Sequence, residues 1–204
     1  MADFYSARSR QLQDRFDTRR LADRARQVIV HDRITIEDQR FIESLAMLFI
    51  ATVDARGHPQ CSYKGGAPGF VRVLDECTLA FPFYDGNGMY LTAGNVLESS
   101  NVGLLFMDFA NARRLRVNGS ASVDVQDSML GDYHEAQLIV RVAVREIFVN
   151  CPRYVHKAVW VEDSPFVPKR GCETPIPDWK RKDSMLDALS AQDRARLERE
   201  KSGR

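Results

Sequence analysis

The sequence predicts a mainly β protein in which six or seven strands form a closed or half-open antiparallel barrel. Residues 114–125 alternate between polar and apolar side chains, which is the pattern of a strand with one buried face. Further strand-like runs precede and follow this one, and turns rich in Gly, Asn and Asp join them with few helical segments between. This order of runs favours one antiparallel sheet.

The composition supports a globular chain with a sizeable core. Of the 204 residues, 44% are apolar, which is enough for one large domain. The 29 basic and 28 acidic residues nearly balance, so the chain lacks the cationic excess of a general nucleic-acid binder. No apolar signal core begins the chain and no run approaches about 18 apolar residues, so we expect a soluble, cytoplasmic protein without a membrane partner.

The cysteines are expected to be unpaired thiols. No two of them form a C-x-x-C pair, and no His/Cys cluster has the spacing of a zinc site, so we expect no metal. They are Cys61, Cys77, Cys151 and Cys172. Unpaired cysteines are typical of a reducing compartment.

We expect three parts along the chain. Residues 1–36 form an N-terminal helical arm, because residues 4–28 are charged and lack Pro and Gly. Residues 37–160 form the barrel, and residues 161–204 form a Pro-rich segment with a C-terminal helix packed on the barrel. The apolar stripe of the arm is narrow and consists of Leu12, Phe16, Leu21 and Ala25.

Local signals predict the first barrel elements. Thr35 before two acidic residues predicts a capped helix that runs to about Ser44. The nearly continuous apolar run 45–53 predicts a buried strand, and residues 54–57 form a hairpin turn. Residues 59–66 form the second strand and end in two glycines, which often mark the close approach of a ligand or of another backbone.

The middle of the barrel continues as a meander. Residues 70–74 and 78–84 are predicted strands, and the D-G-N-G sequence at 85–88 is a strong turn signal. A short helix is expected to begin at Asn95, whose side chain caps its first turn. Residues 102–109 form another buried strand.

The last elements are a pair of long strands and two helices. One face of strand 114–125 carries Leu115, Val117, Gly119, Ala121, Val123 and Val125, and the other carries Arg114, Arg116, Asn118, Ser120, Ser122 and Asp124. Residues 138–149 form the last long strand. Residues 150–157 are expected to be a helix with a proline in its first turn. Four prolines make residues 162–179 irregular, and residues 183–201 form a charged helix.

Four short motifs occur in an order that resembles one known family. They are D-A-R-G-H-P after the first strand, S-Y-K-G-G in the second, a G-N turn with a short helix and N-V-G-L-L-F, and R-L-R-V-N-G in the alternating strand. Together they resemble the flavin-binding split-barrel family that includes pyridoxamine 5'-phosphate oxidase. The resemblance covers about residues 37–160.

The resemblance implies a six-stranded antiparallel split barrel with flanking helices at both termini. It also implies a homodimer that holds FMN in a groove between the subunits. The implied contacts to the flavin come from Ser62, Tyr63, Lys64 and Gly65 on one strand, from Phe81 and Pro82 on the next, and from Arg114.

Two stretches depart from the family pattern. The oxidase holds the FMN phosphate with a Ser-Arg-Lys run, whereas the corresponding stretch 90–92 is Tyr-Leu-Thr and has no cation. The substrate-binding arginine and histidine of the oxidase have loose counterparts in Arg153 and His156. The sequence therefore indicates a related flavoprotein rather than the vitamin B6 oxidase itself. The alternative phosphate partners are Asn87, Asn95, Lys64, Arg113, Arg114 and Arg116.

Each of these residues also has an ordinary structural role open to it. Lys64 would be a strand-surface lysine, and the arginines of the long strand would pair with Asp108 or Asp124. The two asparagines would be a turn residue and a helix cap. Arg153 and His156 would share the solvated face of a helix.

The predicted function is an FMN-dependent oxidoreductase that acts through flavin N5 on a small substrate, an anionic one if Arg153 and His156 bind it. No Ser/His/Asp triad or carboxylate pair is recognisable by spacing, so catalytic residues are left unassigned. The alternative is a carrier or sensor of the same fold that binds flavin, deazaflavin or haem without turning it over. A third interpretation is a dimeric scaffold with an empty groove.

Overall fold

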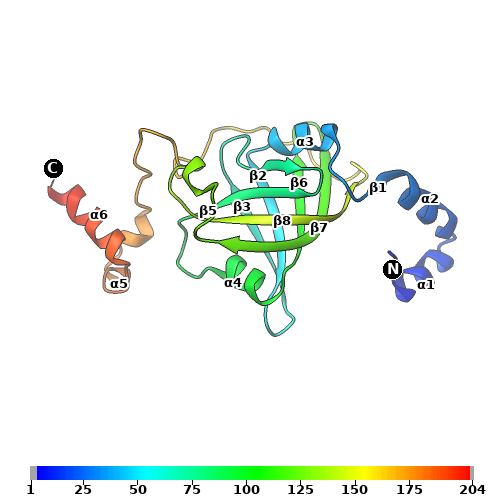
Figure 1. Ribbon diagram of the computed structural model, residues 1–204, viewed down its shortest axis with the longest axis horizontal. Helices are drawn as coiled ribbons and strands as arrows, with labels where there is room; N and C mark the ends of the chain where they lie inside the picture. Colours follow the sequence, from blue (N-terminus) through cyan, green and yellow to red (C-terminus); the bar gives the residue numbers. More distant parts are fainter. Residues whose placement is uncertain (1–3, 203–204) are drawn as a thin grey trace. The chain divides into compact units, whose positions relative to one another are not determined.

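One antiparallel sheet curls into a split barrel (Figure 1). The computed structural model describes residues 4–202, and in that range the sheet has eight strands in the order β3-β2-β6-β7-β8-β5-β4, with β1 paired to β8. Since β3 and β4 end this order without pairing to each other, the sheet does not close. The strands are β1 (Val30–His31), β2 (Met47–Val53), β3 (Pro59–Gly65), β4 (Arg72–Asp75), β5 (Thr78–Tyr84), β6 (Asn101–Asp108), β7 (Arg113–Asp124) and β8 (Ala136–Val149).

The six long strands confirm the predicted barrel. Each of β2, β3, β5, β6, β7 and β8 has at least seven residues and lies within about two residues of its predicted place. The short strands β1 and β4 add to this set; the first was not predicted. In β7 the predicted inward face is buried from Leu115 to Ala121, whereas Val125 lies beyond the strand and is exposed. The interior is filled by one apolar cluster, to which Leu48, Ile50, Phe81 and Phe106 contribute.

Helix α3 (Ile36–Glu43) forms where the sequence places it. The Thr35 hydroxyl accepts a hydrogen bond from the backbone N–H of Asp38, and the Asp38 carboxylate accepts one from the backbone N–H of Thr35. This capping box satisfies backbone donors that the first turn leaves free. Phe41 and Ile42 pack into the core, so the helix covers one end of the barrel.

The prediction that a helix begins at Asn95 is wrong. Helix α4 spans Leu91–Glu98, so Asn95 lies inside it and does not cap it. The chain enters α4 through Tyr90, which has a left-handed backbone (φ 48°). Left-handed φ is uncommon for a residue other than glycine, and local sequence signals do not reveal it. Ala93 and Val96 of α4 are buried in the core.

The N-terminal arm contains two helices rather than one. Helices α1 (Ala7–Arg15) and α2 (Arg19–Ile29) are separated at Asp17, which has a φ of 51°. The Arg19 guanidinium pairs with Asp14 across this break at 2.5 Å and 2.6 Å. The first three residues of the predicted arm lie outside the described residues.

The predicted helix at residues 150–157 is also wrong, because the chain after β8 has no regular structure up to residue 161. Two contacts hold it against the barrel. An Arg114 guanidinium N–H donates to the Cys151 carbonyl at 2.7 Å, and the Ala158 N–H donates to the Phe109 carbonyl at 3.2 Å. Tyr154 has a φ of 69°, which a helix does not allow.

Residues 162–202 form a second compact unit. After the irregular Pro-rich stretch come η2 (Asp178–Arg181), α5 (Asp183–Leu186) and α6 (Ala191–Ser202), so the predicted helix 183–201 is interrupted. Ile176, Leu189 and Leu197 form its core. The buried ammonium of Lys180 donates to both carboxylate oxygens of Asp193 at 2.9 Å and 3.0 Å. The packing of this unit on the barrel stays a prediction.

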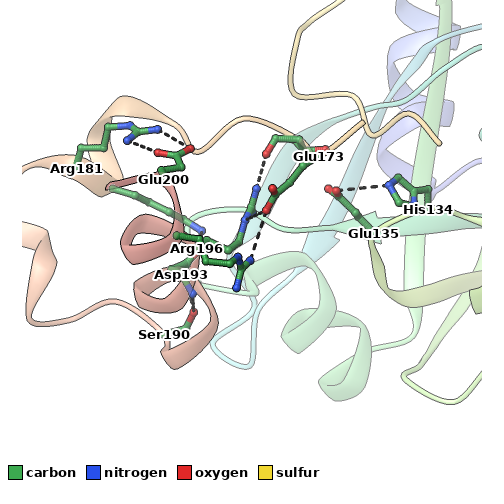
Figure 2. Close-up of polar contacts among 11 residues, drawn as sticks. His134, Glu135, Glu173, Arg181, Ser190, Asp193, Arg196 and Glu200 are labelled. Atoms are coloured by element: carbon green, nitrogen blue, oxygen red, sulfur yellow. Dashed lines mark hydrogen bonds and ion pairs between the residues drawn. The ribbon is translucent and has the colours of Figure 1, made fainter. Parts of the chain in front are cut away.

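Further ion pairs tie η2 and the Pro-rich stretch to α6 (Figure 2). Arg181 pairs with Glu200 at 2.7 Å, and Arg196 pairs with Glu173 at 3.0 Å.

No helix in the described part of the chain is long and apolar enough to cross a membrane. All four cysteines are free thiols.

An ion pair between a half-buried arginine and a buried aspartate fastens the loop before β8 to the outside of the barrel. The Arg141 guanidinium donates to both carboxylate oxygens of Asp127, at 2.5 Å and 2.8 Å, and only 5% of the Asp127 side chain is exposed. Beside this pair, Ala80, Tyr133 and Ile139 form a small apolar cluster. The Arg141 hydrogen bonds lower the pKa of the Asp127 carboxyl below its ordinary value of 3.8.

This lowered pKa predicts a pH-dependent stability. The Asp127 carboxylate stabilises the folded chain fully above pH 3.8, and this contribution is lost as the pH falls through the lower folded-state pKa. We expect Asp127→Asn to have a lower urea midpoint of unfolding than the wild type at about pH 7. The gap between the two midpoints is expected to narrow below pH 3.8. Urea titrations over this range measure it, with the exposed Glu162→Gln as control. A gap that stays constant down to about pH 3 would contradict the assignment.

Candidate functional site

The strand register divides the predicted cofactor residues between two faces of the sheet. In β3, Lys64 and Ser62 lie opposite Leu48 and Ile50 of β2, which are core residues, so these two polar side chains lie on the inner face. Tyr63 lies opposite Phe49 and therefore on the outer face. The sequence placed these neighbours beside one ligand, and strand geometry turns their side chains in opposite directions.

Lys64 is the central residue of the inner face. Its ammonium nitrogen lies 4.4 Å from the centre of the Phe83 ring, a cation–π contact. Burial lowers the pKa of Lys64 below its usual value of 10.5. No carboxylate lies within ion-pair distance of it among residues 4–202. A half-buried cation with only an aromatic partner favours an anion beside it.

An aromatic pair extends the surface beside Lys64. The rings of Phe83 and Tyr90 stack with centroids 5.8 Å apart and planes 12° from parallel. The Tyr90 hydroxyl donates to the Gln137 side-chain oxygen at 2.7 Å, which fixes the ring over β5 and β8. Tyr90 is 44% exposed, so the cluster of Lys64, Phe83, Tyr90 and Gln137 reaches solvent. We call these four residues the Lys64 cluster.

Three side-chain hydrogen bonds hold helix α4 against β2 and β3. The Thr92 hydroxyl donates to the Ser62 hydroxyl at 3.2 Å. The buried amide of Asn95 donates to the Thr52 hydroxyl at 2.9 Å and to the Gln60 side-chain oxygen at 3.1 Å. Both N–H groups of Asn95 are therefore used inside the protein. Its place in the site is to hold α4 in register with the strand that carries Lys64.

On the outer face, Tyr63 folds over its own strand. A Cβ added at Gly65 would lie 2.9 Å from Cε1 of Tyr63, so only glycine leaves room for the ring there. The ring also meets Phe49 edge to face, with centroids 5.9 Å apart. Tyr63 remains 54% exposed. The glycine signal in the sequence thus marks a close approach by a neighbouring side chain.

Arg114 and Arg116 of β7 lie on this same outer face, whereas Arg113 contacts the ring of the core residue Phe41 at 4.8 Å. Register places Arg116 opposite Leu105, and Leu105 opposite Phe49. Arg116 contacts the Phe148 ring, with its guanidinium carbon 5.6 Å from the ring centre. Arg114 donates to the Cys151 carbonyl, and its Nε is buried without a hydrogen-bond partner.

These arginines lack the acidic partners that were considered for them. Asp108 accepts hydrogen bonds from Asn111, and Asp124 accepts one from the Gln126 N–H. In the described chain no carboxylate lies within ion-pair distance of Arg114 or Arg116. The outer face therefore carries two cations that a ligand or a second subunit can neutralise.

The other predicted cofactor residues lie apart from the Lys64 cluster. Phe81 is completely buried in the core and Pro82 is buried on the outer face, so neither offers an open ring surface. Asn87 is exposed and accepts a hydrogen bond from the Met89 N–H at 3.1 Å, as a turn residue does.

Arg153 and His156 do not share a helix face, since no helix forms around them. Arg153 is exposed, and its Nε donates to the Cys151 sulfur at 3.1 Å. Hydrogen bonds from the Arg153 backbone N–H and, to a smaller extent, from its side chain lower the pKa of the Cys151 thiol from 9.0. His156 is exposed. The predicted substrate pair therefore lies on an irregular, solvent-facing segment.

Sequence reasoning missed Phe83, Tyr90 and Gln137, the other three residues of the Lys64 cluster. Tyr90 was noted only for lacking a positive charge, and its aromatic ring was the available signal. No signal in the sequence links Gln137 to Tyr90, because they are 47 positions apart. Over residues 4–202, no group of three or more His, Cys, Asp or Glu side chains is placed to bind a metal.

The chain matches a known sequence family over most of the barrel. Residues 34–151, more than half of the chain, match the family described as pyridoxamine 5'-phosphate oxidase. No curated protein matches the chain.

Several solved structures are similar to it. HupZ of Group A Streptococcus is 20% identical with a TM-score of 0.48, over 62% of this chain and 99% of that one. An FMN-binding protein from Syntrophomonas wolfei subsp. wolfei is 11% identical with a TM-score of 0.44, over 69% and 97%. HutZ, the haem storage protein from Vibrio cholerae, is 19% identical with a TM-score of 0.42, over 57% and 94%.

Proposed function

Because the chain belongs to the pyridoxamine 5'-phosphate oxidase family, we propose that it binds FMN beside β3 and acts as an FMN-dependent oxidoreductase on a small substrate. The observation that carries this proposal is Lys64. It is a half-buried cation with an aromatic contact and no carboxylate partner in the described chain, and it lies within the matched residues.

The residues around Lys64 fit the chemistry of FMN in three respects. The ammonium supplies positive charge for an anionic group of the cofactor. The first backbone N–H groups of α4, near Thr92, have no partner within the helix and favour an anion. Phe83 and Tyr90 supply aromatic surface for a planar ring. This arrangement replaces the Ser-Arg-Lys run that the chain lacks.

A ligand at the free edge of β3 would reach both faces of the strand. Because β3 ends the order of the sheet, one of its edges is unpaired. A molecule lying along that edge would meet Lys64 and Ser62 from one side and Tyr63 from the other. We therefore place the proposed FMN along this edge, where its contacts include Ser62 and Lys64 on one face and Tyr63 on the other.

We also propose that two copies build the complete site, as the family resemblance implies. Arg114 and Arg116 project from the outer face, away from Lys64 of the same copy. Their charges would then act on the cofactor or substrate held by a second copy.

When bound, FMN supplies the redox chemistry at its N5 atom. The contribution of the protein is charge and position. Lys64 neutralises negative charge next to the cofactor, and Asn95 holds α4 in register with β3. Tyr90 covers part of the ring surface of Phe83. Arg153 and His156, on the exposed segment after β8, are proposed to meet an anionic substrate.

The absorbance spectrum of freshly purified protein tests this proposal. We expect the bands of an oxidised flavin, release of FMN mass on heating, and reduction of the bound flavin by NAD(P)H or dithionite followed by reoxidation by an added acceptor. A bound flavin that no acceptor reoxidises would indicate a carrier instead of an oxidoreductase. A single intense Soret band would indicate haem, and protein that takes up no FMN in excess would refute the proposal.

A further inference from the structure

The N-terminal arm is a built helical hairpin. Arg10 of α1 pairs with Asp23 of α2 at 2.6 Å. The Tyr5 hydroxyl donates to the Ala22 carbonyl at 2.8 Å. Together with the pairing of Arg19 and Asp14 across the break, these contacts fix the two helices relative to each other. Polar groups hold the hairpin together from one side.

The apolar side chains of the hairpin are left in solvent. Neither α1 nor α2 contains a buried residue. Leu12 is 57% exposed, Phe16 and Leu21 are each 69% exposed, and Val28 is 70% exposed. Helices of 9 and 11 residues are marginal in water unless an apolar face packs against something. The open face of α1 and α2 therefore requires an occupant.

Charge limits what that occupant can be. Residues 4–29 contain seven arginines and three aspartates. On α2, Arg24 flanks the apolar face that Leu21 and Val28 share at helical spacing. A second hairpin would bring like charges together, which opposes pairing of two arms. Residues 30–161 instead contain 15 acidic and 12 basic residues, so the barrel has the opposite charge.

The barrel carries a surface of matching character on α4. Leu97 is 74% exposed, Leu91 is 46% exposed, and Met89, just before the helix, is 60% exposed. Glu98 ends the helix and is exposed. This face of α4 is complementary to the arm in two respects, since it offers apolar side chains to the apolar residues of the arm and an acidic residue to its arginines.

We propose that the arm of one copy docks on the exposed face of α4 of a second copy. Since each copy carries both surfaces, the exchange is reciprocal and closes a symmetric dimer. The apolar residues of α2 meet Leu91 and Leu97, and Arg24 lies near Glu98 of the second copy. The proposal rests on the homodimer suggested above and names the surface that forms it. One part of this surface lies on α4, whose first turn borders the Lys64 cluster.

The dissociation constant of the full-length dimer, from analytical ultracentrifugation, tests the docking surface. Leu21→Ser with Val28→Ser, and separately Leu97→Ser, are each expected to raise this constant at least tenfold, because apolar area at the interface is lost. Val125→Ser, an exposed apolar residue outside both surfaces, is the control. Arg24→Glu and Glu98→Arg are each expected to weaken the dimer, and the double variant is expected to restore it.

Two further measurements separate a docking effect from damage to the barrel or to the cofactor site. Thermal unfolding of each variant shows that the barrel is intact, and FMN titration reports on the cofactor site independently. If the wild type is a dimer and the arm and Leu97 variants have the same dissociation constant as the wild type, the docking is overturned and the homodimer stands. A wild type that is monomeric at all concentrations would overturn both. Arm-dependent binding to vesicles of anionic phospholipid, without an effect on the dimer, would assign the arm to a membrane surface instead.

Discussion

Replacing Lys64 by methionine is expected to weaken FMN binding by about 10- to 100-fold. The variant keeps the length of the side chain and its packing on Phe83 but loses the cation. A hydrogen bond to a charged group contributes about 1.5–3 kcal/mol, and each 1.4 kcal/mol corresponds to about tenfold in affinity. Burial already disfavours the charged form of Lys64, so methionine is not expected to destabilise the free protein.

Quenching of FMN fluorescence on titration with protein measures this effect. Lys64→Arg keeps the charge and is expected to lose much less affinity than the methionine variant. Lys157→Met, which removes an exposed lysine after β8, is the matched control and should bind FMN as the wild type does. Equal affinity of Lys64→Met and the wild type would remove Lys64 from the site and with it the main support for the proposed function.

Substituting Gly119 by alanine is expected to produce the largest loss of stability in the barrel. A Cβ at this position of β7 would lie 2.2 Å from the backbone oxygen of Ala143 in β8. The register of the two strands shifts next to it, between Asn118 and Gly119, so the backbones are already irregular there. Because the obstacle is backbone rather than a flexible side chain, the strands must separate to admit a methyl group.

Gly119→Ala is expected to lower the free energy of unfolding by about 3 kcal/mol, the upper part of the range for overpacking. For a chain of this length, that corresponds to a fall in the melting temperature of about 6–12 °C. Gly94→Ala is a matched control, because a Cβ at Gly94 of α4 meets nothing within 4 Å. Its higher helix propensity should raise the melting temperature by about 2–4 °C. If Gly119→Ala has the same melting temperature as the wild type, the close pairing of β7 with β8 at this position is incorrect.

The barrel strands were predictable because their signals are local. Alternation along β7 reports a buried face directly, since successive side chains of a strand point to opposite sides. Thr35 and Asp38 carry the helix cap within four consecutive residues. The start of α4 and the absence of a helix after β8 were not predictable in this way. Tyr90 and Tyr154 adopt left-handed backbones, and the Tyr90 hydroxyl donates a hydrogen bond to Gln137, 47 positions away.

The candidate site was predictable only in part for the same reason. Lys64 stood out beside two glycines and within a family motif, and the structure places it with Phe83 and Tyr90. The expectation that Asn95 caps a helix was wrong, because its side chain bonds instead to Thr52 and Gln60, which are 43 and 35 positions away. Arg153 and His156 were singled out as counterparts of the substrate-binding residues of the oxidase, and the helix that would have aligned them does not form.

The sequence by itself determined the antiparallel barrel, the helices at both ends and the family, since periodicity, caps and ordered motifs are properties of short segments. The tertiary structure alone decided which face each candidate residue occupies and what surrounds it. A shift of one residue in strand register exchanges the inner and outer faces, so the separation of Lys64 from Arg114 and Arg116 depends on pairing between distant strands. The exposure of the apolar side chains of the arm is likewise known only from the tertiary structure, because burial depends on how the whole chain packs.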